Sequence, residues 1–138
     1  MEKFKTPKIE EVVKNIPSIA YKQKWQISLD KEDGILYYSP KKIPDNTRLF
    51  QVTDEFALFL DKKNSPHGVM VECYAHNFMK HHLELKNLSK EINLFSKNED
   101  DEIVIKMNKK DKNVQLFREL FEKTIISESL VGPLHTNR

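Results

Sequence analysis

The densest hydrophobic pattern in the chain lies in residues 56–82, FALFLDKKNSPHGVMVECYAHNFMKHH. Its first five residues are all apolar, which is typical of a short central strand that is buried on both faces. Residues 61–68 contain Asn, Ser, Pro and Gly and favour a loop. Residues 69–74 then alternate between two faces and predict a second strand. We therefore expect a hairpin here, followed by a helix.

Shorter alternating segments toward the N-terminus extend this hairpin into a sheet. Residues 25–30 and 35–39 predict two strands, and Asp33-Gly34 between them is the strongest short-range signal for a tight hairpin turn. Residues 49–52 predict a third strand. The result is a meander of about five antiparallel strands.

Residues 54–63 leave two interpretations open. Thr53, Asp54 and Glu55 suit either a tight turn before a strand or the capped, acidic first turn of a helix. Two phenylalanines in the apolar run, and the turn and strand that follow it, favour the strand.

Helices are predicted on both sides of the strands. Residues 7–16 fit a short helix with proline in its first turn, and Pro17 ends it. Residues 75–95 and 110–131 each carry an apolar stripe at helical spacing. The stripes consist of Phe78, Met79, His82, Leu83, Leu85, Leu88, Ile92 and Phe95 in the first helix, and of Leu116, Phe117, Leu120, Phe121, Thr124 and Ile125 in the second.

The expected architecture is one α+β domain over residues 1–138. Antiparallel strands occupy residues 25–74, the two C-terminal helices pack on one face, and a short N-terminal helix precedes the strands. Residues 103–107 predict a short strand at a sheet edge. Gly132-Pro133 ends the last helix, and residues 132–138 form a tail.

Composition narrows the class of protein. A length of 138 residues fits a single domain, and the sole cysteine excludes an intrachain disulfide and fits a reducing compartment. No segment is long and apolar enough for a membrane span, and residues 1–10 are too charged for a signal peptide. A net charge of +2 with both signs interspersed gives no expectation of nucleic acid or membrane binding. These features favour a cytoplasmic protein.

Four of the five histidines, His67, His76, His81 and His82, fall in the apolar segment and raise the question of a metal site. Ligands on one helix need a common face, usually at spacings of three or four residues. Here His81 and His82 follow His76 by five and six residues, which turns their rings about 120–140° away from it. No carboxylate or cysteine at ligand spacing completes a set. We expect no metal and no cofactor.

Other candidate chemistry is weaker. The alternation places Cys73 on the core face, where burial suppresses thiol reactivity, so a Cys73–His76 pair is not favoured as a nucleophile and base. Residues 99–102 are acidic but lack the alternating ligands and glycine of a calcium loop. Lys106, Lys109, Lys110, Lys112 and Arg118 are locally basic, yet no aromatic residues interleave them as base stacking would require.

The apolar surface of the sheet is the more informative feature. A sheet covered by helices on one face should be polar on the other, but the strand Phe56–Leu60 is apolar throughout. An uncovered apolar face of this size would be a liability for aggregation. The sequence therefore predicts a protein partner or a second copy on this face; the alternative is that residues 40–46 and the N-terminal helix cover it within one chain. The predicted contact residues are Phe56, Leu58, Phe59, Met70 and Tyr74.

Three segments carry a resemblance: DGILYYS in residues 33–39, Asp54 through Leu60-Asp61, and GVMVE in residues 68–72. They resemble a family of small uncharacterised bacterial β-hairpin domains. In that family a D-x-L-Y-I strand precedes a strand ending in Asp, a turn, and a G-I-E-I strand leading to a helix. The resemblance covers residues 27–77, although the loop at residues 40–46 is long and the helices after His76 extend beyond such a domain. Some members lie beside toxin-like genes, so the resemblance implies a binding role, but it transfers no functional residue.

The leading hypothesis is a non-enzymatic interaction module, self-associating or capping a partner as an antitoxin or immunity protein would. A first alternative is a small enzyme or ligand-binding domain that uses His67, His76 or Asp54 in a cleft between sheet and helices. A second is a nucleic-acid-associated protein that uses the basic residues between Lys106 and Arg118.

Overall fold

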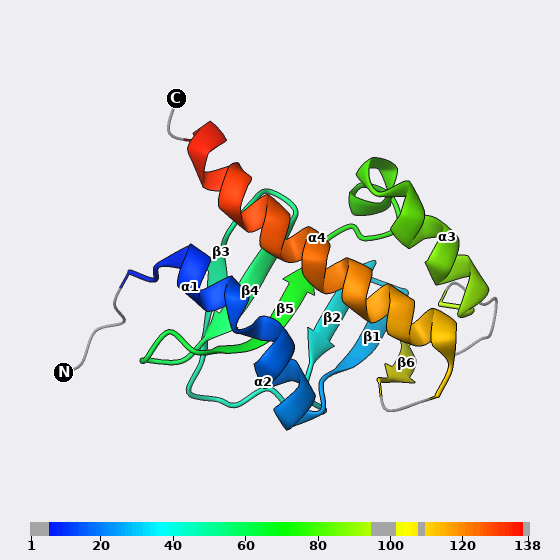
Figure 1. Cartoon of the computed structure of the whole chain (residues 1–138), viewed down its shortest axis with the longest axis horizontal. Helices are drawn as coiled ribbons and strands as arrows, with labels where there is room; N and C mark the ends of the chain where they lie inside the picture. Colours follow the sequence, from blue (N-terminus) through cyan, green and yellow to red (C-terminus); the bar gives the residue numbers. More distant parts are fainter. Residues whose placement is uncertain (1–5, 95–101, 108–109, 137–138) are drawn as a thin grey trace.

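The computed structural model describes residues 6–94, 102–107 and 110–136. It has an α+β architecture, with one antiparallel sheet and a layer of helices (Figure 1). The helices are α1 (Ile9–Lys14), α2 (Ile16–Gln23), the 3-10 turn η1 (Phe78–His81), α3 (Leu83–Glu91) and α4 (Lys112–Thr136). The strands are β1 (Gln26–Asp30), β2 (Ile35–Ser39), β3 (Arg48–Gln51), β4 (Phe56–Leu60), β5 (Pro66–Val71) and β6 (Glu102–Lys106).

The strands follow one another in space in the order β3-β4-β5-β2-β1-β6, and each neighbouring pair is antiparallel. The five strands expected within residues 25–74 are present, and residues 54–63 contain a strand rather than a helix. The edge strand expected at residues 103–107 forms β6 beside β1, so the sheet has six strands instead of about five. Gly34 closes the β1–β2 hairpin with a φ of +70°, a conformation that glycine adopts without strain.

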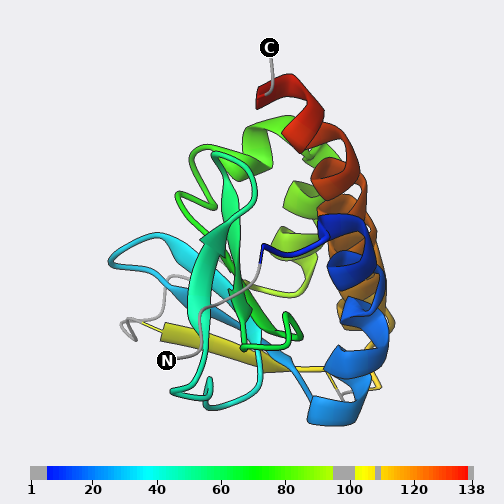
Figure 2. The ribbon, with the colours of Figure 1, turned by 90° about the vertical axis from the view of Figure 1, so that its left-hand side faces the viewer.

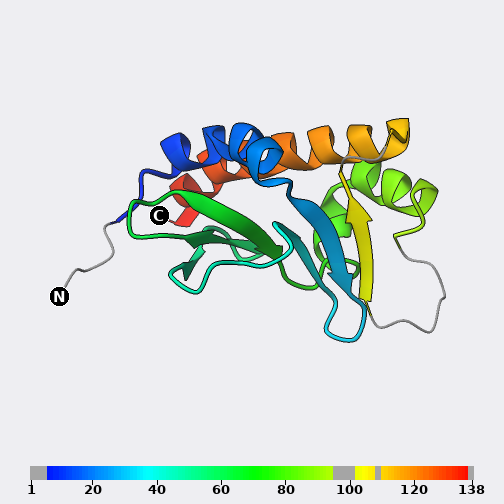
Figure 3. The ribbon, with the colours of Figure 1, turned by 90° about the horizontal axis from the view of Figure 1, so that it is seen from below.

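The helices cover one face of the sheet. Figures 2 and 3 show the sheet edge-on, with α1, α2 and α4 on the same side of it. Helix α3 packs against α4. The two C-terminal helices therefore share this layer with both N-terminal helices. We call the opposite surface the open face, because no described helix lies over it.

The core lies between the inner face of the sheet and the helices. In β1, β2, β4 and β5, register and alternation place every second residue on this inner face, and these residues are almost completely buried. Tyr38 is at its centre, with edge-to-face contacts to Trp25 at 5.1 Å and to Phe121 at 5.7 Å between ring centroids. Other large buried side chains are Ile16, Ile27, Leu36, Phe56, Leu58, Leu60, Tyr74, Phe78 and Phe117.

Three helix boundaries differ from those predicted. Pro17 does not end the N-terminal helical segment but lies in the first turn of α2, where a missing N–H costs nothing. Helix α3 begins at Leu83 instead of residue 75, because a turn and η1 occupy the preceding residues; Phe95 lies outside the described residues. Helix α4 continues through Gly132-Pro133, where a tail was predicted.

Candidate functional site

A pocket of about 1020 Å³ lies where the C-terminal end of α2 faces the first turns of α4. The start of β1, the segment after β2 and the end of β6 complete its walls (Figure 1). Its lining residues are Ala20, Tyr21, Lys22, Gln23, Lys24, Trp25, Gln26, Tyr38, Pro40, Lys41, Lys42, Lys106, Met107, Gln115 and Arg118.

Local backbone interactions hold the walls of this pocket in place. Lys24 adopts a left-handed conformation with a φ of 55° and ends α2. The N–H of Trp25 then donates to the carbonyl of Ala20 at 2.9 Å, which turns the chain into β1 and buries the indole ring. On the opposite wall, the amide of Gln115 donates to the carbonyl of Met107 at 2.6 Å and ties α4 to the end of β6.

The floor of the pocket contains a buried polar network. The hydroxyl of Tyr38 donates to Oε2 of Glu122 at 2.6 Å, and the Arg118 guanidinium donates to Oε1 of the same carboxylate at 2.9 Å. Burial raises the pKa of Glu122 above its ordinary value, although the hydrogen bonds from Tyr38 and Arg118 oppose that shift. Burial and the adjacent carboxylate also raise the pKa of Tyr38, which keeps its hydroxyl a neutral donor. The floor is thus held rigidly, and the charge of Arg118 is balanced.

The rim of the pocket is strongly basic. Five exposed lysines surround it, and within the described ranges none of them pairs with a carboxylate. Within the described part of the chain, no Asp or Glu side chain lines the pocket, even though the whole sequence carries 21 acidic residues against 23 basic ones. The positive charge is therefore a local concentration, and it attracts anions. The rim lysines are Lys22, Lys24, Lys41, Lys42 and Lys106.

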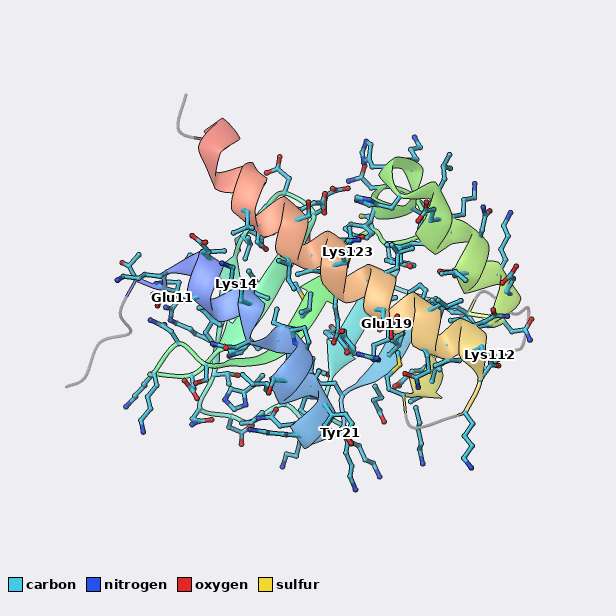
Figure 4. The ribbon with its side chains drawn as sticks, in the orientation of Figure 1. Glu11, Lys14, Tyr21, Lys112, Glu119 and Lys123 are labelled. Carbon is cyan, nitrogen blue, oxygen red and sulfur yellow. The ribbon has the colours of Figure 1, made fainter. Side chains whose placement is uncertain are left out.

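An aromatic side chain stands on the same rim. Tyr21 lies at the lower end of α2 in Figure 4 and is 86% exposed, although it is one of the largest apolar side chains of the helix. An exposed tyrosine ring offers a flat surface on which a planar ligand group can stack. The polar side chains that the pocket presents are thus lysine ammonium groups, an arginine, amides and tyrosine hydroxyls.

The predicted contact residues divide between the core and the open face. Phe56, Leu58 and Tyr74 have no exposed surface, because they face the helices, which corrects their expected place on the open sheet face. Phe59 and Met70 do belong to the open face, where Met70 is 8% exposed. The apolarity of β4 on both sides thus reflects a buried inner face and a partly buried outer one.

The residues of the proposed catalytic cleft do not come together. His67 lies at the start of β5 and contacts the carboxylate of Asp61 at 2.8 Å, whereas Asp54 lies at the far end of the β4–β5 pair. The side chains of Asp54 and His76 are both exposed. Cys73 is exposed too, because β5 ends at Val71 and the chain turns with a positive φ at Cys73; its predicted place on the core face is wrong.

The basic pocket was only partly foreseeable from the sequence. Lys106 and Arg118 belong to the basic region of the nucleic-acid alternative, but no pattern along the chain links that region to the lysines at residues 22–24 and 41–42. A usable signal exists, since the hairpin predicted from Asp33-Gly34 pairs Gln26 with Ser39. That register brings the segments before β1 and after β2, both lysine-rich, to the same end of the sheet.

No protein-family model, curated protein or solved structure matches this chain. Among the residues that the structure describes, no helix combines the length and the apolar character that crossing a membrane requires.

Proposed function

We propose that the protein is a non-enzymatic binding domain whose pocket between α2 and α4 takes a small phosphorylated molecule with a planar ring. The observation that carries this proposal is the group of five exposed lysines around a pocket of about 1020 Å³; among the residues that the structure describes, no carboxylate pairs with them or lines the pocket. The size is at the upper end of ordinary small-molecule sites, which span about 300–1,000 Å³.

The chemistry of the rim supports each part of this ligand. Lysine ammonium groups bind phosphate oxygens through charge-assisted hydrogen bonds, which are stronger than neutral ones. Long lysine side chains at the rim reach phosphates of different lengths, because each ammonium group rotates freely on a four-carbon stem. The Tyr21 ring at the same rim supplies a stacking surface for the planar group.

Calorimetric titration with adenosine diphosphate and with inorganic pyrophosphate, without divalent metal, tests the proposal. The two probes differ by the nucleoside alone, so a tighter fit for the nucleotide reports the contribution of the ring. We expect nucleotide binding that weakens with salt, because exposed charges are screened. Replacing Lys41 and Lys42 together by alanine should weaken it about tenfold, which corresponds to about 1.4 kcal/mol.

A matched double variant gives the control. Lys86 and Lys90 are exposed lysines of α3 that lie outside the pocket, and their replacement by alanine removes the same charge. Binding should then stay at the level of the unmodified protein. Equal losses in both double variants would place the anion elsewhere, and no binding of either probe would reject the proposed ligand class.

We also propose a second candidate function, self-association through the open face. The residues of this patch on β3, β4, β5 and β2 are all uncharged, which favours contact between two copies there. Leu49 is 47% exposed there and pairs across the strands with Phe59. The residues of this patch are Ile35, Tyr37, Ser39, Leu49, Gln51, Ala57, Phe59, Gly68 and Met70.

Light scattering coupled to size-exclusion chromatography tests this second candidate. Leu49→Glu should convert a dimer into a monomer, because the partner copy would have to bury a carboxylate against apolar side chains. Leu116→Glu changes another exposed leucine, on α4 and 52% exposed, and should leave the dimer intact. A wild-type protein that is monomeric at every concentration tested contradicts the proposal.

A further inference from the structure

Three side chains of metal-ligand type converge far from the basic pocket. Glu55 lies in the turn between β3 and β4, His82 lies between η1 and α3, and Glu128 lies on α4. One ligand atom from each residue lies within 4.8 Å of the other two. The three residues come from separate elements, so the tertiary fold brings them together and no local sequence motif does.

The turn that carries Glu55 is fixed by several hydrogen bonds. The hydroxyl of Thr53 accepts the N–H groups of Glu55 at 3.1 Å and of Phe56 at 3.2 Å. The carbonyl of Glu55 in turn accepts the N–H of Glu72 at 3.1 Å, next to the end of β5. The carboxylate therefore starts from a backbone that has little freedom to move.

His82 and Glu128 are positioned with similar precision. The imidazole of His82 packs on the buried ring of Phe78 with centroids 4.4 Å apart, and its backbone N–H donates to the carbonyl of Met79 at 3.2 Å. Its Nε2 lies 3.3 Å from Oε1 of Glu128. Helix α4 is anchored at this level by the buried side chains of Ile125 and Ser129.

The distances suit a small divalent cation. Zinc binds imidazole nitrogen and carboxylate oxygen at about 2.0–2.2 Å, so two tetrahedral ligand atoms lie about 3.4 Å apart. The distance of 3.3 Å between Nε2 of His82 and Oε1 of Glu128 matches that separation. The three ligand atoms lie within 4.8 Å of one another, so small side-chain rotations would bring all of them to ligand distance from one ion. A cation would occupy the space that the His82–Glu128 hydrogen bond now spans.

The electrostatics of the cluster favour a cation as well. Oε2 of Glu128 is buried, and no N–H or O–H group among the described residues donates to it. The Glu55 and Glu128 carboxylates lie close together in the cluster, and a shared positive ion would offset the repulsion between them.

His81 completes the surroundings of the cluster. Its Nδ1 lies 3.2 Å from Oε2 of Glu55, and its side chain is 62% exposed. A histidine that contacts a ligating carboxylate from outside orients it, as outer partners do in metal sites generally.

We propose that Glu55, His82 and Glu128 form a binding site for one divalent transition metal ion of the zinc type, with His81 as an orienting residue. Three protein ligands leave a fourth position for water or a further ligand, as in zinc sites that are not closed. The site is independent of the basic pocket and does not rest on the function proposed for it.

The test is a titration of the metal-free protein with Zn²⁺ alone, in competition with a chromogenic chelator. We expect one ion per chain in the unmodified protein and a loss of affinity of about tenfold or more in both His82→Gln and Glu128→Gln. Zn²⁺ should also raise the thermal unfolding midpoint of the unmodified protein, because it binds the folded state, but not that of the variants. His76→Gln, which changes an exposed histidine outside the cluster, should bind as the unmodified protein does.

Several outcomes overturn the proposal. They are the absence of one-to-one binding, unchanged affinity in both ligand variants, or an equal loss in His76→Gln. Circular dichroism without metal checks that each variant is folded. If His82→Gln unfolds because the ring packs on Phe78, Glu55→Gln replaces it, since this change leaves the packing of the core untouched.

Discussion

Glu122 is the residue on which the floor of the basic pocket depends. It is 4% exposed and holds both the Tyr38 hydroxyl and the Arg118 guanidinium. Glu122→Ala removes the acceptor for both and leaves Arg118 with the exposed Glu119 as its carboxylate contact. We expect the free energy of unfolding, measured with urea, to fall by about 3–5 kcal/mol.

Glu119 serves as the control for the expected loss of unfolding free energy in Glu122→Ala. It also contacts Arg118, at 3.6 Å, but its side chain is 64% exposed. Glu119→Ala should change the free energy of unfolding by less than about 0.5 kcal/mol, because water already screens that pair. Similar losses in the two variants would show that burial of the Glu122 network is not what stabilises it.

Asp61, which follows β4, makes the stability of the fold depend on pH. Burial alone would raise its pKa, but hydrogen bonds from His67 and from the N–H groups of Ser65 and Lys63 lower it below 3.8. Because the folded pKa is lowered, the stability from Asp61 is present above pH 3.8 and is lost as the pH falls through the folded value. Asp61→Asn should cost about 1–3 kcal/mol at neutral pH.

Urea unfolding of both proteins across the acidic range checks this expectation. The difference in unfolding free energy between Asp61→Asn and the unmodified protein should shrink as the pH falls below 3.8. A difference that grows in acid would contradict the assigned direction of the pKa shift.

At the scale of elements, strands β4, β5 and β2 approach so closely that one position accepts glycine alone. A Cβ atom on Gly68 would lie 2.8 Å from the Cβ of Ser39 and 3.3 Å from the ring of Phe59. Gly68→Ala should therefore destabilise the protein by about 1–3 kcal/mol. Adding Ser39→Gly should recover part of that loss, and a double-mutant cycle measures how much. Strictly additive losses would argue against a steric cause.

The strands were predictable because their signals are local. Alternation and the Asp33-Gly34 turn define β1 and β2, and the apolar run of Phe56–Leu60 defines β4. The predicted start of the helix at residue 75 was wrong because of a tertiary contact. The N–H of Tyr74 donates to the carbonyl of Gly34 at 2.9 Å, which holds the chain at the β1–β2 turn and delays the helix to Leu83.

At the scale of the whole molecule, the candidate sites could not be predicted because each is assembled from distant segments. The basic pocket takes its lysines from three parts of the chain, and the acidic partners of His82 lie 27 and 46 residues away from it. Spacing along the sequence can reveal ligands that lie on one helix, but it cannot reveal ligands that come from three separate elements. The net charge of +2 for the whole chain also gives no sign of the local excess of lysine at the pocket.

The strand order affects how the protein folds while the ribosome synthesises it. Strand β1 is made early, yet its outer neighbour β6 begins at Glu102, and α4, which covers the sheet, follows later still. Until those segments leave the exit tunnel, the nascent chain presents a bare strand edge beside an uncovered apolar surface. Both are templates for pairing with other chains. Slow translation after β5 should therefore lower the soluble yield, and synonymous codons in that region become a means of controlling it.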